Sequence, residues 1–439
     1  MKKTWKKAVV FSVAATISFC ATGIQVQADS ATDEPVTIQF WKASSDEKRN
    51  EWWETKIAEF EEKYPGIKVE YLGIPGDSSA FAQKLDMAIA TGEVPDAIST
   101  FLESNMIARD VLEPLDDYWE SWENNSQVPQ QYIDLYKSMD YTSDEPKLYA
   151  TPVGSNVQCW YVRPDLLAEA GLQVPETWDE FFEAAEKTTD KDQGIYGYII
   201  RGGGGNVDHL QYLMYSYSGI TNFFEDGKCT INDPLHVEFV EKYLGGYGKF
   251  TSEDDISKSW PEMAAQFQSG KAVMICHNLG SAEANYAAFD DDESRILAIP
   301  YFKSKTGKIV IPSFRPAGNM IMKDAQHKDE AWIFLQWLAE AEQDSSYHEL
   351  MANMPINTES LKADWIQNVS YMKMGADMYE NPDLEFCVLP YYLPNFSTIA
   401  NDYVSPNIQK VMLGEMSAKD FLDGWAEALQ KDYDAVMTR

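Results

Sequence analysis

Residues able to do chemistry are plentiful in this chain, but no catalytic or metal-binding motif is complete. His348-Glu349 would need a second histidine at position 352 to form a zinc-protease helix, and Ala352 stands there. The glycine run at 202–205 lacks the following Lys-Ser/Thr pair of a phosphate-binding loop. Carboxylates are so numerous that a glycosidase pair can be neither selected nor excluded by spacing. The sequence therefore gives no positive indication of catalysis, of a metal site or of a cofactor.

Aromatic and amide side chains instead gather where strands are expected to end. An aromatic ring can cover the C–H face of a sugar, while amides and hydroxyls can bond the hydroxyl groups at its rim. Each residue alone could equally be structural, so the set suggests a carbohydrate site without establishing one. The set comprises Trp41, Phe101, Asn156, Trp160, Asn278 and the run 390–396.

The charge balance excludes some classes of partner. The formal net charge is −34 over 439 residues. Phosphate groups would be repelled by so acidic a surface, which argues against binding to nucleic acids or to anionic membranes. The charge keeps the protein in solution but does not identify a ligand.

The N-terminal segment 1–28 is predicted to be a signal peptide. Four lysines precede an apolar stretch from Ala8 to Ile17, and Val26-Gln27-Ala28 supplies the small residues that a signal peptidase reads. We therefore expect export, with a mature chain from Asp29. Cys20 raises the alternative of a lipid anchor, which is disfavoured because Phe19 stands where a small residue is needed.

The pattern that follows predicts a parallel α/β unit. Strands and helices alternate at the spacing of right-handed crossovers, and ligands of such sheets bind at the carboxyl ends of the strands. Those ends fall at 41–45 and at 100–103, and a polar turn is expected over 42–46. The predicted strands are 35–41, 67–72 and 95–101, and the predicted helices are 47–64 and 79–91.

A second α/β pattern runs from residue 164 to residue 300, so two domains are expected. The extended stretches 149–162 and 309–318 are predicted to cross between them, and a third crossing should follow Asn357. One apolar helix is expected over 329–342 and two helices over 401–431. The cysteines of the mature chain have no metal-site spacing, and whether any pair forms a disulfide is left open; they are Cys159, Cys229, Cys276 and Cys387.

Seven segments together resemble the extracellular solute-binding proteins of bacterial ABC importers, of the maltodextrin-like sugar-binding type (family 1). Each segment is degenerate, but they occur in the family's order through nearly the whole mature chain. Arg163 departs from the asparagine usual in the family, and Phe19-Cys20 departs from the usual lipoprotein motif. The segments are 38–41, 60–69, 90–96, 149–161, 174–181, 267–274 and 330–338.

The resemblance implies an α/β, two-lobed, periplasmic-binding-protein-like fold with hinge strands between the lobes. Its N-terminal lobe would comprise 36–150 plus 318–364, and its C-terminal lobe 151–317 plus 365–439. It also implies a monomeric, non-enzymatic, extracytoplasmic protein that closes on a mono- or oligosaccharide and presents it to ABC permease subunits, without a cofactor. By the family's pattern, ligand contacts would come from Trp41, Ser44, Ser45, Phe101, Ser155, Asn156, Trp160, Arg201, Asn278, Arg315, Tyr391, Tyr392 and Phe396.

Three alternatives remain open at this point. Arg201 and Arg315 would suit an acidic sugar or a glycerol phosphate, although both could equally form ion pairs. A secreted carbohydrate-active enzyme and a surface adhesin for polysaccharide would also carry aromatic residues at the site. The sequence does not identify the sugar or its length.

Overall fold

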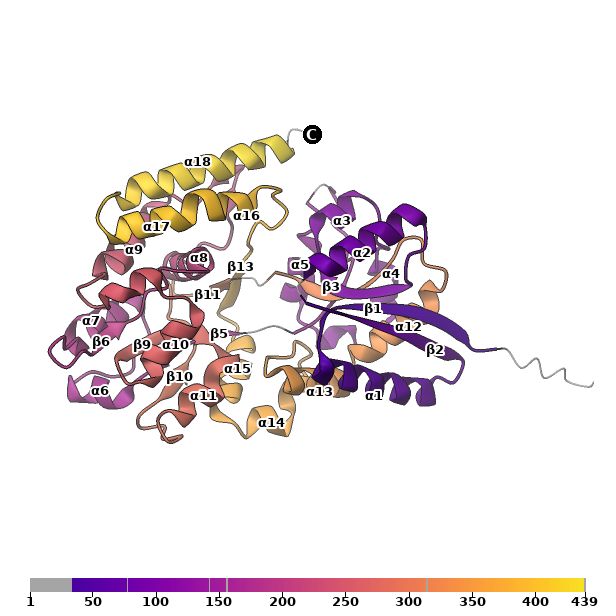
Figure 1. Cartoon of the computed structure of the whole chain (residues 1–439), viewed down its shortest axis with the longest axis horizontal. Coiled ribbons are helices and arrows are strands. Elements are labelled where there is room, and N and C mark those ends of the chain that lie inside the picture. The colour runs from indigo at the N-terminus through magenta and orange to yellow at the C-terminus, as the bar shows by residue number, and fades with distance from the viewer. Residues whose placement is uncertain (1–33, 77, 142, 155–156, 313–314, 438–439) are drawn as a thin grey trace, which may run out of the picture. The chain divides into compact units, whose positions relative to one another are not determined.

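The computed structural model describes residues 34–76, 78–141, 143–154, 157–312 and 315–437. The predicted signal peptide and Cys20 lie outside these residues and stay predictions. Residues Pro35–Arg439 form one unit by their contacts. Within it, two main sheets are each covered by helices (Figure 1).

The first sheet begins with the predicted parallel unit, which is confirmed. β1 pairs in parallel with both β2 and β3, as the strand–helix–strand spacing requires. A later strand, β12, then pairs antiparallel with β3 and also with β4. In spatial order the strands are β2 (Ile67–Pro75), β1 (Val36–Ser45), β3 (Ala97–Phe101), β12 (Ala317–Ile321) and β4 (Thr151–Pro152).

β1 is longer than predicted, and the turn expected at 42–46 is wrong. The strand runs through Lys42 to Ser45 because β2 continues beside it as far as Pro75. The pairing register shifts between Ala43 and Ser45, which marks an irregularity at the end of the strand. Asp46 then caps helix α1 (Glu47–Lys63) by accepting a 2.8 Å hydrogen bond from the backbone N–H of Arg49.

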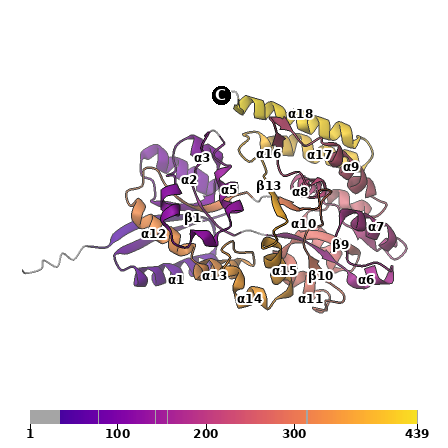
Figure 2. The ribbon, with the colours of Figure 1, turned by 180° about the vertical axis from the view of Figure 1, so that it is seen from behind.

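Aromatic packing attaches the helices to this sheet. Phe40 of β1 is fully buried and lies 5.1 Å from Trp53 of α1 (Glu47–Lys63) and 5.3 Å from Phe334 of α12 (Lys328–Leu338), between ring centroids. Both helices therefore cover the Phe40 face. Helix α2 (Ser78–Thr91) lies on the side of the sheet opposite α1 (Figures 1 and 2).

The second sheet contains the aromatic-rich strand that follows the first crossing. Every residue from Cys159 to Val162 in β5 is buried, so both faces of this strand are covered. Helix α7 (Trp178–Thr188) begins with a capping box made by Thr177 and Glu180, as a Thr-x-x-Glu sequence predicts. The strands in spatial order are β10 (Leu297–Ile299), β5 (Gln158–Val162), β9 (Ala272–Asn278) and β6 (Tyr196–Tyr198).

The remaining elements surround these sheets. The helix predicted over 329–342 is broken, because Glu340 adopts an extended backbone between α12 and α13 (Ala341–Met351). Two short pairs are β11 (Ile309–Pro312) with β13 (Leu384–Cys387) and β7 (Phe224–Glu225) with β8 (Lys228–Cys229). The other helices are α3 (Ser104–Ala108), α4 (Asp116–Ser121), α5 (Gln130–Lys137), α6 (Pro164–Glu169), α8 (Asn206–Ser218), α9 (Pro234–Tyr243), α10 (Trp260–Gln268), α11 (Ala282–Ala287), α13 (Ala341–Met351), α14 (Asp364–Gln367), α15 (Ser370–Tyr379), α16 (Phe396–Ile399), α17 (Ser405–Met412) and α18 (Ala418–Met437).

Two of the expected crossings are visible in the topology. The chain leaves the first sheet at β4 and enters the second at β5, and it returns from β11 to β12. The exact lobe boundaries and the third crossing after Asn357 stay predictions. The four cysteines of this unit are free thiols, of which only Cys229 is not fully buried. Within the described ranges, no helix is both long enough and apolar enough to cross a membrane.

A buried carboxylate, Asp96, ties the first sheet to the loop before α12. Its Oδ2 accepts from the Gln39 N–H at 2.9 Å, and its Oδ1 accepts from the N–H groups of Gln326 and His327 at 3.0 Å each. Replacing Asp96 by alanine would leave these backbone donors without their charged acceptor. Each such bond is worth about 1.5–3 kcal/mol.

We therefore expect Asp96→Ala to lower the free energy of unfolding by about 3 kcal/mol or more. Asp96→Asn should lower the free energy of unfolding by less, because one oxygen acceptor remains. The control is Asp324→Ala, an exposed residue of the same loop, expected to change the value by less than about 0.5 kcal/mol. Equal denaturant midpoints for the alanine variants at 96 and 324 would contradict this role.

Candidate ligand-binding site

A cavity of about 840 Å³ lies where β1 and β3 of the first sheet end. This is the edge at which the parallel pattern predicts ligands. Parts of both crossings and of the second α/β region complete its wall. The wall includes 42–44 and 99–101 from the strand ends, 153–154 and Arg315 from the crossings, 204–205 from the glycine loop, 206–208 from the start of α8, and 347–348 of α13.

The end of β1 presents two cations to the cavity. Ser44 has a positive φ of 56°, which is unusual for a residue other than glycine, and its carbonyl accepts a 2.5 Å hydrogen bond from Arg49 Nη1. The neighbouring Ala43 carbonyl accepts from Lys42 Nζ at 3.1 Å. Burial of the Lys42 ammonium, together with the Arg49 charge, lowers its pKa to about 8.

Aromatic residues of α1 and α13 form the adjoining wall. The Trp52 indole N–H donates to Ser346 Oγ at 3.0 Å, and its ring lies 4.9 Å from that of Tyr347 between centroids. Both Trp52 and Tyr347 line the cavity. Their mutual packing fixes an aromatic surface beside the end of β1.

The first crossing is held against the end of α13. Gly154 N–H donates to His348 Nε2 at 3.0 Å, and His348 Nδ1 lies 2.6 Å from Asn353 Oδ1. His348 Nε2 also lies 3.1 Å from Asp344 Oδ1. A Cβ at Gly154 would come within 2.1 Å of the Met354 carbonyl oxygen, so only glycine fits this path.

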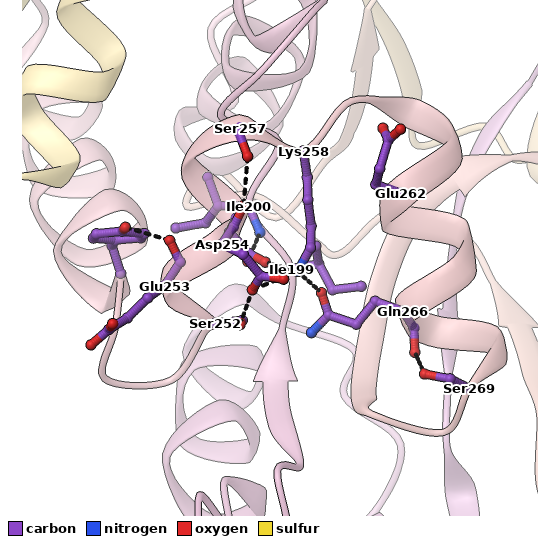
Figure 3. A network of polar contacts seen from close by, with 12 residues as sticks. Ile199, Ile200, Ser252, Glu253, Asp254, Ser257, Lys258, Glu262, Gln266 and Ser269 are labelled. Atoms are coloured by element: carbon purple, nitrogen blue, oxygen red, sulfur yellow. Dashed lines mark hydrogen bonds and ion pairs between the residues drawn. The ribbon is translucent and has the colours of Figure 1, made fainter.

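The glycine loop is fixed by the segment before α10. Gly202 N–H donates to the Asp255 carbonyl at 3.0 Å, and Gly203 N–H donates to the Lys258 carbonyl at 2.8 Å. These donors are therefore used by the protein, whereas Gly204 and Gly205 line the cavity. Asp255 Oδ2 accepts from the Ile200 N–H at 2.8 Å and Oδ1 from Lys258 Nζ at 2.7 Å. Figure 3 shows Lys258 extending from this segment towards Gln266 of α10, to which it also donates.

Five of the predicted ligand-binding residues line the cavity. Arg315 lies on this wall with its guanidinium over the Phe101 ring, 4.8 Å from its centroid, and pairs with the Glu103 carboxylate. Burial raises the pKa of Glu103, and the Arg315 charge opposes that rise. Tyr391 lies 5.7 Å from Phe396 between ring centroids. The five are Ser44, Phe101, Arg315, Tyr391 and Phe396.

Five other predicted residues lie outside this wall. The Lys84 ammonium lies 4.6 Å from the Trp41 ring centroid, and Tyr392 stacks on Tyr141 at 5.0 Å. Arg201 lies over the Trp260 ring at 4.8 Å, and its Nε donates to the Gly204 carbonyl at 2.6 Å. Ser45 borders a smaller cavity, and the Asn278 carbonyl accepts from the Tyr161 hydroxyl at 2.9 Å. Ser155 and Asn156 lie outside the described residues.

Trp160 requires a correction, because its side chain belongs to the core and does not face the cavity. It is 1% exposed, and its ring lies 4.9 Å from those of Phe181 and Phe302 between centroids. The β-rich run was correctly predicted as a strand. The sequence did not reveal which face Trp160 occupies, since both adjacent residues, Cys159 and Tyr161, are buried too.

The sequence reasoning missed several wall residues. Lys42 was assigned to the expected turn, and Arg49 and Trp52 were assigned only to the predicted helix 47–64. Tyr347 and His348 lie on α13, of which only the first two residues fell within a predicted helix. The adjacent pair Trp52-Trp53 was the available signal, because two consecutive helical residues cannot both face one core direction. Trp53 is buried, whereas Trp52 is only partly so.

Comparisons with known proteins agree with this architecture. A sequence model of the family described as bacterial extracellular solute-binding protein matches residues 43–345. A Brucella abortus protein that bears only the general name of a binding protein is 24% identical over 400 residues, covering 90% of this chain and 92% of that protein. The multiple sugar-binding protein of Streptococcus mutans is 20% identical over 77% of this chain and 79% of its own length.

A solved structure supports the fold directly. The sugar-binding protein MalE from Xanthomonas citri superimposes with a TM-score of 0.74 at 18% identity, covering 92% of this chain and 98% of that chain. The expected α/β, two-lobed fold of the periplasmic binding proteins is thereby confirmed.

The core position of Trp160 gives a testable outcome. Trp160→Ala should lower the free energy of unfolding by about 3–5 kcal/mol, the usual cost of removing a buried tryptophan. The partly exposed Trp365→Ala serves as the control and should cost less. Denaturant unfolding with intrinsic fluorescence measures both. An unchanged midpoint for the Trp160 variant would contradict its assignment to the core.

Proposed function

We propose that this chain, which belongs to the bacterial extracellular solute-binding protein family, binds a carbohydrate outside the cytoplasm and delivers it to an ABC permease. The observation that carries this proposal is the cavity wall. It combines aromatic faces such as Phe101 and Tyr391 with polar side chains such as Ser99, Thr100 and Asn319. Sugars need both kinds of surface.

The size of the cavity favours an oligosaccharide. Small-molecule sites have volumes of roughly 300–1,000 Å³, and this cavity of about 840 Å³ is near the upper end. The names of the Streptococcus mutans relative and the Xanthomonas citri neighbour, both sugar-binding proteins, support the ligand class.

The mechanism needs no catalytic step. Ser44 and Phe101 belong to the first sheet, whereas Asn206 begins α8 and Tyr391 follows β13, neither of which is part of that sheet. A ligand that touches both groups binds the closed arrangement better than the open one and shifts the equilibrium towards closure. The closed monomer is then the form presented to the permease.

A thermal-shift screen of the purified protein over a library of neutral and acidic sugars tests this proposal. A sugar present at 100 times its Kd should stabilise the protein by about 2.7 kcal/mol, and small-angle scattering should report a smaller radius of gyration with it. Absence of stabilisation by every sugar would contradict carbohydrate binding. Products that accumulate during a long incubation would instead indicate an enzyme.

Aromatic stacking predicts a specific loss of affinity. Phe101→Ala and Tyr391→Ala should each weaken sugar binding by about 1–3 kcal/mol, because each removes a ring from the cavity wall. Phe224→Ala is the control, since this ring stacks on Tyr433 at 4.1 Å away from the cavity. Titration calorimetry measures all three. Equal affinities for the Phe101 and Phe224 variants would remove Phe101 from the site.

A further inference from the structure

The Lys42 ammonium lacks a counterion, although acidic residues greatly outnumber basic ones in this chain. Its hydrogen-bond partner is the Ala43 carbonyl at 3.1 Å. Among the described residues, no carboxylate lies within ion-pair distance of it. A positive charge held on the wall of a cavity without a partner carries an electrostatic cost that an anionic ligand would relieve.

Arg49 adds a second cation at the same place. Its Nη1 donates to the Ser44 carbonyl, whereas Lys42 Nζ donates to the Ala43 carbonyl. The two cations therefore bind consecutive carbonyls of the chain. Arg49 has a partial counterion, because its Nε lies 3.3 Å from Asp46 Oδ2. The three side chains therefore leave about one positive charge uncompensated at the end of β1.

The other charged groups on the wall are already engaged. Arg315 pairs with Glu103, and Asp344 accepts from Ser360 Oγ at 2.8 Å beside His348. Asp208 accepts from Gln211 Nε2 at 3.2 Å. Just outside the wall, the Lys84 ammonium lies over the Trp41 ring. The wall tyrosines Tyr212, Tyr347 and Tyr391 have pKa values raised by burial and stay neutral near pH 8.

We propose that Lys42, assisted by Arg49, forms a subsite for the carboxylate of an acidic sugar, so that the ligand is a uronate-containing oligosaccharide. This inference rests on the proposed carbohydrate function and specifies its substrate class. Lys42 supplies the charge, Arg49 supplies a second donor group, and the Ser99 and Thr100 region of β3 adjoins them on the same wall. The sequence suggested Arg201 and Arg315 for an acidic ligand. Arg201 instead lies over the Trp260 ring and Arg315 forms an ion pair with Glu103, so neither carries this inference.

A carboxylate suits this subsite better than a phosphate. One uncompensated positive charge matches a monoanion, whereas a phosphate monoester carries close to two negative charges at neutral pH. The carboxylates of Asp208 and Asp344 lie on the same cavity wall and repel any anion, but they repel a dianion about twice as strongly as a monoanion. The test therefore includes sugar phosphates, which should bind less tightly than uronates if the subsite is built for a carboxylate.

The experiment compares each uronate with a ligand that differs only in charge. Di- and trisaccharides of galacturonate, glucuronate and mannuronate are titrated calorimetrically beside their methyl esters and beside sugar phosphates. We expect at least one uronate to bind about tenfold or more tightly than its ester. Lys42→Met should reduce this ratio by about tenfold, and Lys42→Arg should retain more of it because the charge remains. Lys48→Met, an exposed lysine of α1 outside the cavity, is the charge-matched control and should leave the ratio unchanged.

The outcomes separate this inference from the proposed function. Binding of neutral sugars or esters with no preference for any uronate overturns the carboxylate subsite but keeps carbohydrate binding. A preference for sugar phosphates, or a ratio unaffected by Lys42→Met in a variant with native circular dichroism, also overturns it. Failure of every sugar to bind overturns both.

Proton uptake provides an independent readout. The pKa of Lys42 is lowered to about 8, so about half of the molecules carry the neutral amine at that pH. A bound carboxylate favours the charged form and raises this pKa, so uronate binding at pH 8 should take up as much as about half a proton. Binding of the methyl ester should take up fewer protons than binding of the uronate. The affinity for the uronate should fall as the pH rises from 7 to 10. Calorimetry in buffers of different ionisation enthalpy measures the uptake, and equal uptake for uronate and ester would contradict the subsite.

Discussion

The path of the chain between the two sheets depends on a close backbone contact at Gly154. A side chain there would collide with the Met354 carbonyl, and the Gly154 N–H is already bound to His348. The first crossing is thus joined to the end of α13, a helix that also supplies Tyr347 to the cavity wall. Because the crossing and the wall share these residues, a change in the crossing's path necessarily alters the shape of the cavity.

The cavity combines rigid and irregular parts for a physical reason. Regular strand pairing uses up backbone hydrogen bonds, so polar groups become available only where the pairing ends. At the end of β1, the register shift and the left-handed Ser44 turn two carbonyls towards cations. Elsewhere on the wall, the carbonyls of Asp255 and Lys258 bind the N–H groups of Gly202 and Gly203, and the next residues, Gly204 and Gly205, line the cavity. Both arrangements place polar groups at a precise position without a long flexible loop.

Much of the fold was predictable because its signals are local. The helix start at Asp46, the capping box at Thr177 and the parallel strand pattern all follow from short-range sequence rules. The face of a strand covered on both sides is not a local property. Trp160 and Tyr161 are both buried, so the alternation of side chains along the strand did not indicate which ring would line a cavity. Lys42 was missed because its pairing with two strands distant in the sequence, β2 and β3, keeps that segment extended.

The net charge of −34 and a preference for an acidic ligand are compatible. At physiological ionic strength, charges more than about 8 Å apart in solvent are largely screened from one another. A ligand inside the cavity therefore responds mainly to the groups on its wall, and there the Lys42 charge is less screened than those of exposed acids. The acidic exterior instead acts on the approach of the ligand, slowing the association of an anion. An acidic sugar would thus be held by local charge while its association rate increased with added salt, and a neutral sugar would lack that dependence.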